Sequence, residues 1–294
     1  MTPPTAATPL QTVDDPIIEG FDVVGSLNTD HDEILAHIRY AIRQGHPQVW
    51  TQGVNAEVCC IVGGGPSLSE TKDELVALVH QGAKVFTVNG AYHWCLERHI
   101  HPHAQIVVDA RAENVRFVEP EIPECRYFLA SQCHPALWDA VKGRPKVGIW
   151  HAELKGDTPC ATALDDYYLG WWVPIIGGTT VGSRAIGLCR TLGYLRMHLF
   201  GIDCCYIGTE GHAYAQTENE ADQRLEVTFH PSDRPDLLRR FSVTPWHIRQ
   251  FEDLVKLGRA QGQHFQLTVH GDGLLAYALA TNAVMNTDAQ KEGE

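Results

Sequence analysis

The segment best suited to chemistry is the glycine-rich run Gly63-Gly64-Gly65-Pro66-Ser67, which directly follows the apolar stretch 58–62. Glycine has no Cβ, so the backbone N–H groups of such a run can approach a phosphate closely. Ser67-Leu68-Ser69-Glu70 fits a capping box with Ser67 as N-cap, so we expect the positive end of a helix to face the anion. The run is neither a Walker loop nor a complete GxGxxG fingerprint, and a tight structural turn is the alternative.

A second cluster, Gly177-Gly178-Thr179-Thr180, also stands between an apolar stretch and a segment with helical spacing. Its hydroxyls suit a sugar or a phosphate, whereas an ordinary helix cap is the simpler interpretation. Two helix N-termini at one crevice would share a pyrophosphate or hold a donor and an acceptor.

Polar side chains near these clusters supply the remaining candidates. Asp109 and Asp203 are possible ligands of a Mg²⁺ ion that bridges phosphates, with ribose contacts or turn capping as alternatives. The amide of Asn89 can hydrogen-bond a base, a ribose or a phosphate. His212 is a candidate general base because an imidazole titrates near neutral pH, and Asp203 is the second candidate catalytic residue.

Alternating strands and helices must position these residues. Short apolar runs predict strands over residues 58–62, 84–88, 105–108, 126–130, 146–150, 175–176, 196–200 and 264–269. Helical spacing predicts helices over residues 32–44, 135–141, 181–192 and 245–261, with another between Ser67 and Gly82. The alternation predicts a Rossmann-like α/β fold, a mostly parallel sheet with helices on both faces. Asn89, Asp109, Asp203 and Asp272 then follow strand ends, at the edge where open α/β sheets bind ligands.

One large domain with short extensions accounts for the 294 residues. We expect a flexible N-terminal tail over 1–20, a helical extension over 21–55, the Rossmann-like domain over 56–283 and a flexible C-terminal tail over 284–294.

Composition excludes several classes of protein. The formal net charge of -13 argues against general nucleic-acid binding, which needs a basic surface. No apolar run approaches the roughly 20 residues that span a bilayer, and the N-terminus does not resemble a signal peptide, so no membrane partner is expected. The nine cysteines are odd in number and include the vicinal pairs Cys59-Cys60 and Cys204-Cys205. They indicate reduced thiols and a cytoplasmic location.

A series of short motifs, taken in order, carries a family resemblance. The motifs are VGGGPSL at 62–68, VNGA at 88–91, VVD at 107–109, GTTVG at 178–182, LGY at 192–194, GID at 201–203 and HA at 212–213. They resemble the MptE-like domain, which is named for an archaeal 6-hydroxymethylpterin diphosphokinase. The resemblance spans roughly residues 57–214 and extends toward HGDG at 270–273. Similar proteins occur among tailed phages, which for this chain would imply the host cytoplasm.

The same order of motifs is similar to the bacterial sialyltransferases that use CMP-sugars and to the motility accessory factor glycosyltransferases. In those sialyltransferases the GPSL loop and the Asn after the second strand contact the nucleotide. Carried over, this implies nucleotide contacts from Gly65, Pro66, Ser67 and Asn89. The histidine base of those enzymes lies in a downstream motif with no matching segment here, so His212 does not inherit its role.

The resemblance implies a transferase that uses a nucleotide-activated donor and a hydroxyl-bearing acceptor. Pyrophosphoryl transfer from ATP, which needs Mg²⁺, stands slightly ahead because the domain-level match is better. Glycosyl transfer from a CMP-sugar or another nucleotide-sugar, for which a metal is optional, is the second interpretation. The third is a non-catalytic module that binds a nucleotide or a glycan, such as a phage accessory protein.

Overall fold

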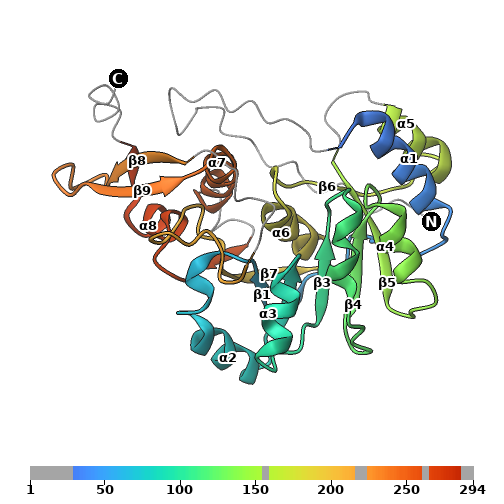
Figure 1. The fold of residues 1–294 in the computed structure, drawn as a ribbon, viewed down its shortest axis with the longest axis horizontal. Helices are drawn as coiled ribbons and strands as arrows, with labels where there is room; N and C mark the ends of the chain where they lie inside the picture. The colour runs from blue at the N-terminus through green and yellow to red at the C-terminus, as the bar shows by residue number, and fades with distance from the viewer. Residues whose placement is uncertain (1–28, 154–158, 216–223, 260–264, 286–294) are drawn as a thin grey trace.

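The structure is a computed structural model that describes residues 29–153, 159–215, 224–259 and 265–285 (Figure 1). The predicted N-terminal tail and residues 286–294 of the predicted C-terminal tail lie outside the described residues. Val284 and Met285, which we assigned to that tail, form a short strand instead. None of the described helices is long and apolar enough to cross a membrane.

An eight-stranded sheet forms the centre of the molecule, and every strand pairing in it is parallel. Its strands, in spatial order, are β10 (Gln266–Val269), β7 (Tyr194–Phe200), β1 (Asn55–Val62), β2 (Lys84–Val88), β3 (Ala104–Val107), β4 (Arg126–Ala130), β5 (Val147–Ala152) and β6 (Pro174–Ile175). The helices around it are α1 (His31–Ile42), α2 (Lys72–His80), α3 (Ala91–Glu97), α4 (Pro135–Ala140), α5 (Pro159–Tyr168) and α6 (Val181–Thr191). Two 3-10 segments, η1 (Pro66–Leu68) and η2 (Ala112–Val118), follow β1 and β3. The predicted Rossmann-like α/β fold is confirmed.

The order of the strands reverses direction between β1 and β7. The chain builds outward from β1 to β6, then returns to place β7 on the other side of β1 and β10 beyond it. Val62 pairs with Phe200, so β1 and β7 end side by side. In open α/β sheets such a switch point is where ligands bind, at the carboxyl ends of the strands.

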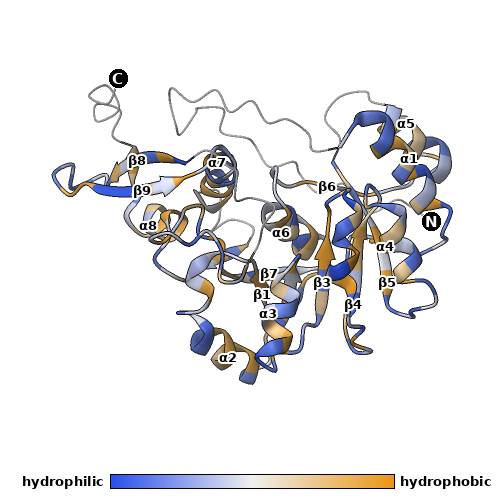
Figure 2. Cartoon of the chain, viewed as in Figure 1, coloured by the Kyte–Doolittle hydropathy of each residue, from blue (hydrophilic) through white to orange (hydrophobic). Residues whose placement is uncertain are grey.

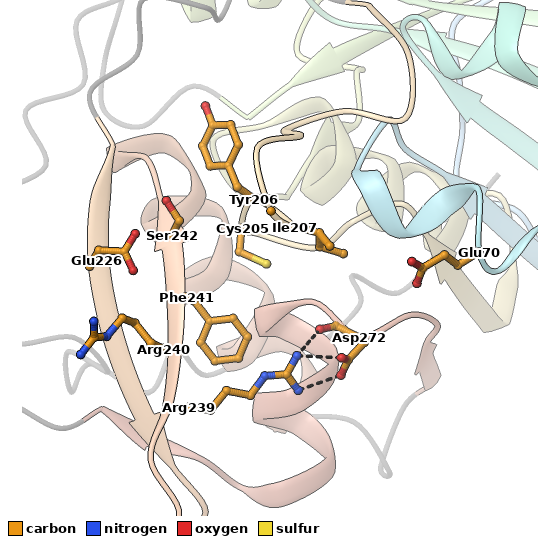
Figure 3. A pocket seen from close by; sticks show the side chains of 11 residues that line it. Glu70, Cys205, Tyr206, Ile207, Glu226, Arg239, Arg240, Phe241, Ser242 and Asp272 are labelled. Carbon is orange, nitrogen blue, oxygen red and sulfur yellow. Dashed lines mark hydrogen bonds and ion pairs between the residues drawn. The ribbon is translucent and has the colours of Figure 1, made fainter.

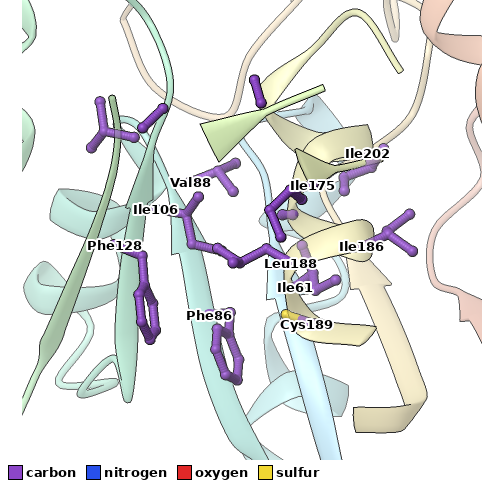
Figure 4. Close-up of a cluster of buried hydrophobic side chains, with 14 of the residues drawn as sticks. Ile61, Phe86, Val88, Ile106, Phe128, Ile175, Ile186, Leu188, Cys189 and Ile202 are labelled. Atoms are coloured by element: carbon purple, nitrogen blue, oxygen red, sulfur yellow. The ribbon is translucent and has the colours of Figure 1, made fainter. Parts of the chain in front are cut away.

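Both faces of the sheet are covered by apolar helices. Along β1, Cys59 and Ile61 join the larger buried cluster with α6, whereas Cys60 and Val62 join the smaller cluster with α2 and α3. This alternation follows from the two-residue period of a strand, and burial on both faces explains why the strand is apolar throughout. Figure 4 shows Ile61 and Phe86 packed against Leu188 and Cys189 of α6. Figure 2 shows the apolar residues concentrated in the central strands.

Helix α1 belongs to the same packing unit as the sheet. It buries Ile38 and Ala41 in the larger cluster and contacts α4 and α5. The described part of the predicted helical extension is therefore integral to the core, and β1 starts at Asn55.

A small antiparallel sheet, which the sequence reasoning missed, stands at one end of the molecule with two helices (Figure 1). Its strands are β11 (Val284–Met285), β8 (Leu225–His230) and β9 (Arg239–Val243), and the helices are α7 (Pro245–Arg259) and α8 (Leu274–Thr281). Phe229 packs edge-on against Phe251 at 5.4 Å between ring centroids, which fixes the sheet against α7.

All nine cysteines are buried and free, as the sequence predicts. Burial raises the pKa of the Cys60 thiol to about 12, so this thiol stays protonated at neutral pH.

His151, at the end of β5, is a buried imidazole that generates a stability prediction. It is 1% exposed, and neither ring nitrogen has a hydrogen-bond partner among the described residues. Burial lowers its pKa from 6.5 to about 4. Between these values the unfolded chain binds a proton that the folded chain does not, so stability rises with pH across the window. The shift corresponds to about 3 kcal/mol.

We therefore expect His151→Phe to reduce the dependence of the free energy of unfolding on pH below neutrality. The free energy of unfolding, measured by urea denaturation from pH 4 to pH 7, should lose about 3 kcal/mol of its pH dependence relative to wild type. His80→Gln, at an exposed position, is the matched control. An unchanged slope in His151→Phe would contradict the assignment.

Candidate active site

Asp203, just after β7, is the residue around which the strand-end loops are built. It is 3% exposed, and its Oδ2 accepts the backbone N–H of Ser67 at 3.0 Å. Its carbonyl oxygen accepts the N–H of Leu275, the second residue of α8, at 3.2 Å. Burial raises the pKa of Asp203, and the hydrogen bonds from Ser67 oppose that rise. One acidic residue thus joins the loop after β1, the loop after β7 and the start of α8.

Glycines surround this contact because no larger residue fits. A Cβ at Gly65 would overlap Asp203 Oδ2 and stand 2.8 Å from the carbonyl oxygen of Gly201. A Cβ at Gly273 would stand 2.6 Å from the Cβ of Asp203. Gly271 has a φ of +102° and faces Ser67 Oγ at a distance that excludes a side chain. These glycines are required by the packing of Asp203, whatever ligand binds.

Most backbone N–H groups of the glycine loop donate hydrogen bonds within the protein. The N–H of Gly63 donates to Phe200 O at 2.8 Å and that of Gly65 to Gly201 O at 2.7 Å, while Ser67 donates to Asp203 and Pro66 has no N–H. The donor left is Gly64, whose N–H has no hydrogen bond among the described residues. The loop therefore offers a phosphate fewer amides than its sequence suggests.

The predicted capping box at Ser67 is wrong. Ser67 is fully buried within η1, and helix α2 begins only at Lys72, after Thr71. The physical reason is that the Ser67 N–H turns inward to Asp203, so the chain makes one 3-10 turn before the helix starts.

Tyr214 covers the ends of β1 and β2. A Cβ at Gly64 would overlap the Tyr214 hydroxyl, and a Cβ at Gly90 would stand 2.7 Å from the ring. The N–H of Ala213 donates to Gly64 O at 2.9 Å and fixes the segment on the loop. A ligand that reaches the backbone of Gly64 or Gly90 must displace this ring.

Asn89, immediately after β2, presents a polar atom without a partner. Its backbone is left-handed, with a φ of 47°, and its carbonyl accepts Gln105 Nε2 at 3.0 Å. The side-chain oxygen Oδ1 is buried and has no hydrogen-bond partner among the described residues. An unpaired buried acceptor is costly, so a donor supplied by a ligand would stabilise the site.

The second glycine cluster forms an ordinary helix start that is already occupied. Thr180 caps α6 in a capping box with Ser183. The N–H and the hydroxyl of Thr179 both donate to Asp253 Oδ2 of α7, at 2.9 and 3.2 Å, and a Cβ at Gly178 would overlap that carboxylate. Gly177 packs on the backbone of α6, where a Cβ would stand 2.7 Å from Arg184 Cα. A carboxylate of the protein therefore holds the position that an anionic ligand was predicted to take.

The two glycine clusters nevertheless lie on the same edge. The side chain of Ile202 stands between them, 2.9 Å from the Cβ position of Gly63 and 3.4 Å from that of Gly182 in α6. The two loops therefore converge as predicted, but only the second is a helix start, and an apolar side chain separates them.

The predicted metal ligands do not fit a preformed Mg²⁺ site. Arg111 binds both carboxylate oxygens of Asp109, with its Nη2 2.7 Å from Oδ2, while Asp203 is committed to Ser67. In the part of the chain that the structure describes, no group of three or more His, Cys, Asp or Glu is placed to hold a metal ion. Mg²⁺ takes oxygen ligands in a strict octahedral arrangement, and here both oxygens of Asp109 and Oδ2 of Asp203 are already hydrogen-bonded.

His212 lies next to Ala213, which is bonded to the glycine loop, and so it stands near the strand ends. Its ring centroid is 6.1 Å from that of Tyr214. The neighbouring His247 accepts the N–H of Thr244 at its Nδ1. Burial, with a smaller contribution from His212, lowers the pKa of His247 to about 4, so His247 is neutral at pH 7.

The family of this chain follows from its sequence. The model of the family described as 6-hydroxymethylpterin diphosphokinase MptE-like matches residues 35–209. This chain belongs to the MptE-like family. No curated protein matches it in sequence.

A solved glycosyltransferase structure shares the fold of this MptE-like chain. The MAf glycosyltransferase from Magnetospirillum magneticum AMB-1 has a TM-score of 0.60 at 16% identity, covering 84% of this chain and 39% of that protein. The chain thus spans about two fifths of the length of that relative. A mammalian sialyltransferase, and the same kind of enzyme in complex with Gal-beta-1-3GalNAc-ortho-nitrophenol, give TM-scores of 0.35 and 0.36 at 14% identity, covering 65% and 64% of this chain and 78% of each of theirs. At 16% identity, the likeness to the MAf glycosyltransferase shows the fold alone.

Sequence reasoning missed two residues that shape the site of this MptE-like chain. Tyr214 directly follows the motif His212-Ala213, but its contacts with Gly64 and Gly90 join distant segments and leave no signal in the local sequence. Asp253 lies within a predicted helix, 74 positions after its partner Thr179, and nothing in the local pattern marks it.

The glycine loop gives a stability prediction with an internal control. Gly65→Ala should lower the free energy of unfolding by about 1–3 kcal/mol, because its Cβ meets the fixed atoms of Asp203 and Gly201. Gly64→Ala should cost clearly less, because its Cβ meets the hydroxyl end of Tyr214, which can rotate away. Urea denaturation of both variants tests this, and equal losses would contradict the packing described.

The buried carboxylate gives a pH prediction. Because the pKa of Asp203 is raised above 3.8 in the folded state, the folded chain holds a proton that the unfolded chain releases, and stability falls as pH rises through that window. Asp203→Asn keeps an acceptor for the Ser67 N–H and removes the charge. The free energy of unfolding of Asp203→Asn should increase relative to that of wild type as pH rises from 3.8 toward neutrality. A difference that is independent of pH would refute the raised pKa.

Proposed function

We propose that this MptE-like protein is a transferase that binds a nucleotide-activated donor at the β1–β7 switch point and transfers a group to an acceptor hydroxyl. The observation that carries the proposal is the buried, unpaired Oδ1 of Asn89, which stands at a strand end beside the glycine loop. The exocyclic amine of a base or a ribose hydroxyl would supply the missing donor. The family description, which names a diphosphokinase, and the fold shared with a glycosyltransferase both support a transferase.

Glycosyl transfer from a nucleotide-sugar is the reaction that the geometry supports best. Pyrophosphoryl transfer places large charge on phosphate oxygens and relies on Mg²⁺. Both oxygens of Asp109 and Oδ2 of Asp203, the two predicted metal ligands, are already hydrogen-bonded within the protein. Glycosyl transfer can proceed with amide and hydroxyl donors alone. Pyrophosphoryl transfer from ATP to a hydroxymethyl group remains the second candidate, favoured by the family description.

In the proposed step the acceptor oxygen forms a bond to the anomeric carbon of the donor sugar. The bond from that carbon to the phosphate oxygen breaks, and the leaving nucleotide keeps the electron pair. The acceptor proton passes to a base, for which we propose His212 because its segment packs on the glycine loop. Tyr214 must rotate from Gly64 and Gly90 before the nucleotide reaches them.

Thermal-shift measurements with ATP, CTP, CMP and UDP-sugars, each with and without Mg²⁺, test nucleotide binding directly, because a ligand that binds the folded state raises the melting temperature. Asn89→Gly should weaken binding of the nucleotide found by about 1–3 kcal/mol, which is roughly 5- to 150-fold. Asn282→Gly is the matched control, since Asn282 is also left-handed, with a φ of 48°, and caps α8. Equal nucleotide affinity in Asn89→Gly and wild type would contradict the assignment of Asn89 to the nucleotide site.

Metal dependence separates the two reactions. We expect turnover of a nucleotide-sugar to persist in excess EDTA, and His212→Gln to lower kcat with little change in nucleotide affinity. Activity that is abolished by EDTA and restored by Mg²⁺ would favour pyrophosphoryl transfer over glycosyl transfer.

A further inference from the structure

A cavity of about 410 Å³ lies between the parallel sheet and the small antiparallel sheet (Figure 3). One wall comes from strand-end loops and carries Glu70, Tyr206 and Asp272; the other comes from β8 and β9 and carries Glu226 and Ser242. The N–H of Tyr206 donates to Ser242 O at 2.8 Å, so the two walls are tied together. The cavity is within the size range of small-molecule sites.

This cavity adjoins the proposed donor site. Asp272 stands between Gly271, which packs on Ser67, and Gly273, which packs on Asp203. Glu70, on the same wall, follows η1 of the glycine loop. The negative charges of Glu70 and Asp272 both act on Asp203, in agreement with this proximity. A molecule in the cavity would therefore lie beside the strand ends of β1 and β7.

The charge of the lining disfavours a phosphate there. Three carboxylates, Glu70, Glu226 and Asp272, face two arginines, Arg239 and Arg240. The Arg239 guanidinium is fully engaged by Asp272, with Nη1 2.7 Å from Oδ1 and Nη2 2.8 Å from Oδ2. The remaining balance is acidic, so the anionic donor belongs on the Asn89 side and the cavity suits a neutral occupant.

The hydrogen-bonding groups that the cavity offers a ligand are mainly acceptors, so a ligand must supply the donors. In the described part of the chain the carboxylates of Glu70 and Glu226 make no hydrogen bond or ion pair, and an ionised carboxylate can only accept. Flat aromatic ligands lack a stacking surface, because Arg239 lies over the Phe241 ring at 4.8 Å and Arg224 over the Tyr206 ring at 4.0 Å. Hydroxyl groups, which donate in several directions, match these acceptors.

We propose that this cavity is the acceptor site and that it takes a neutral, polyhydroxylated molecule of the size of one or two sugar units. The inference rests on the proposed function, in which a hydroxyl of the acceptor meets the donor at the switch point. Glu226 accepts hydrogen bonds from the acceptor hydroxyls and positions it, while Glu70 does the same from the opposite wall.

Saturation-transfer NMR with lactose, N-acetyl-D-glucosamine and D-mannose tests the site, with N-acetylneuraminic acid and 6-hydroxymethylpterin as comparators. We expect at least one neutral sugar to bind, and Glu226→Ala to weaken it by about tenfold or more, as for loss of a charged hydrogen-bond partner. Glu226 is exposed on β8, so its truncation should leave the fold intact. Glu124→Ala, an exposed glutamate just before β4 at the opposite edge of the sheet, is the matched control.

The outcomes separate this inference from the proposed function, because nucleotide thermal shifts are recorded on the same variants and should be unchanged. Nucleotide binding without any neutral-sugar binding, or sugar binding that Glu226→Ala does not weaken, overturns the acceptor site alone. Binding of 6-hydroxymethylpterin that depends on Glu226 overturns the class of acceptor. Sugar binding in a protein that binds none of the nucleotides overturns the proposed function and the acceptor role with it.

Discussion

The buried carboxylate of Asp203 is the constraint on which the form of the strand-end edge depends. A carboxylate removed from water is tolerated only when it is hydrogen-bonded, and here the Ser67 N–H meets that need. The requirement brings three chain segments together, because the loop after β1, the loop after β7 and the start of α8 must all reach the same residue. Glycines at 65, 271 and 273 follow from it, since any Cβ there would enter the space of the contact.

This constraint changes what the glycine run means for ligand binding. A phosphate placed against the Ser67 amide would compete with Asp203 for the same N–H and would be repelled by its charge when ionised. The backbone N–H that remains for a ligand is that of Gly64, which lies farther along the edge, toward the end of β2. There the proposed nucleotide would meet Asn89, whose amide oxygen is buried and unpaired among the described residues, and Tyr214, whose ring covers both strand ends. In the proposed donor site, recognition of the base or ribose by Asn89 thus takes the place of a cradle of loop amides.

Much of the fold was predictable from local sequence, whereas the partners within the site were not. Strands β2 and β4 match the predicted ranges because a short apolar run buried on both faces leaves a signal in consecutive residues. The antiparallel strand β9 escaped because Arg239 and Arg240 interrupt its alternation. The position of Asp109 at a strand end was found, but its pairing with Arg111 two residues on was read as an open ligand site. Contacts such as Thr179 with Asp253 join segments 74 positions apart, and no local periodicity encodes them.

The small sheet supplies what a Rossmann-like edge alone lacks, a second wall. A parallel sheet presents its carboxyl edge to solvent, so one substrate can rest on it while the other has nothing to bind against. Here β8 and β9 stand over that edge and are fixed by the Tyr206–Ser242 backbone bond and the bidentate Arg239–Asp272 pair. An ion pair this exposed adds little stability, but its two parallel hydrogen bonds set the angle between the walls. Because this pair cancels the charges of both Arg239 and Asp272, the charge that the cavity offers a ligand comes from Glu70, Glu226 and Arg240 and is acidic on balance. In the proposed reaction this charge separates a neutral acceptor from an anionic donor, as their positions do.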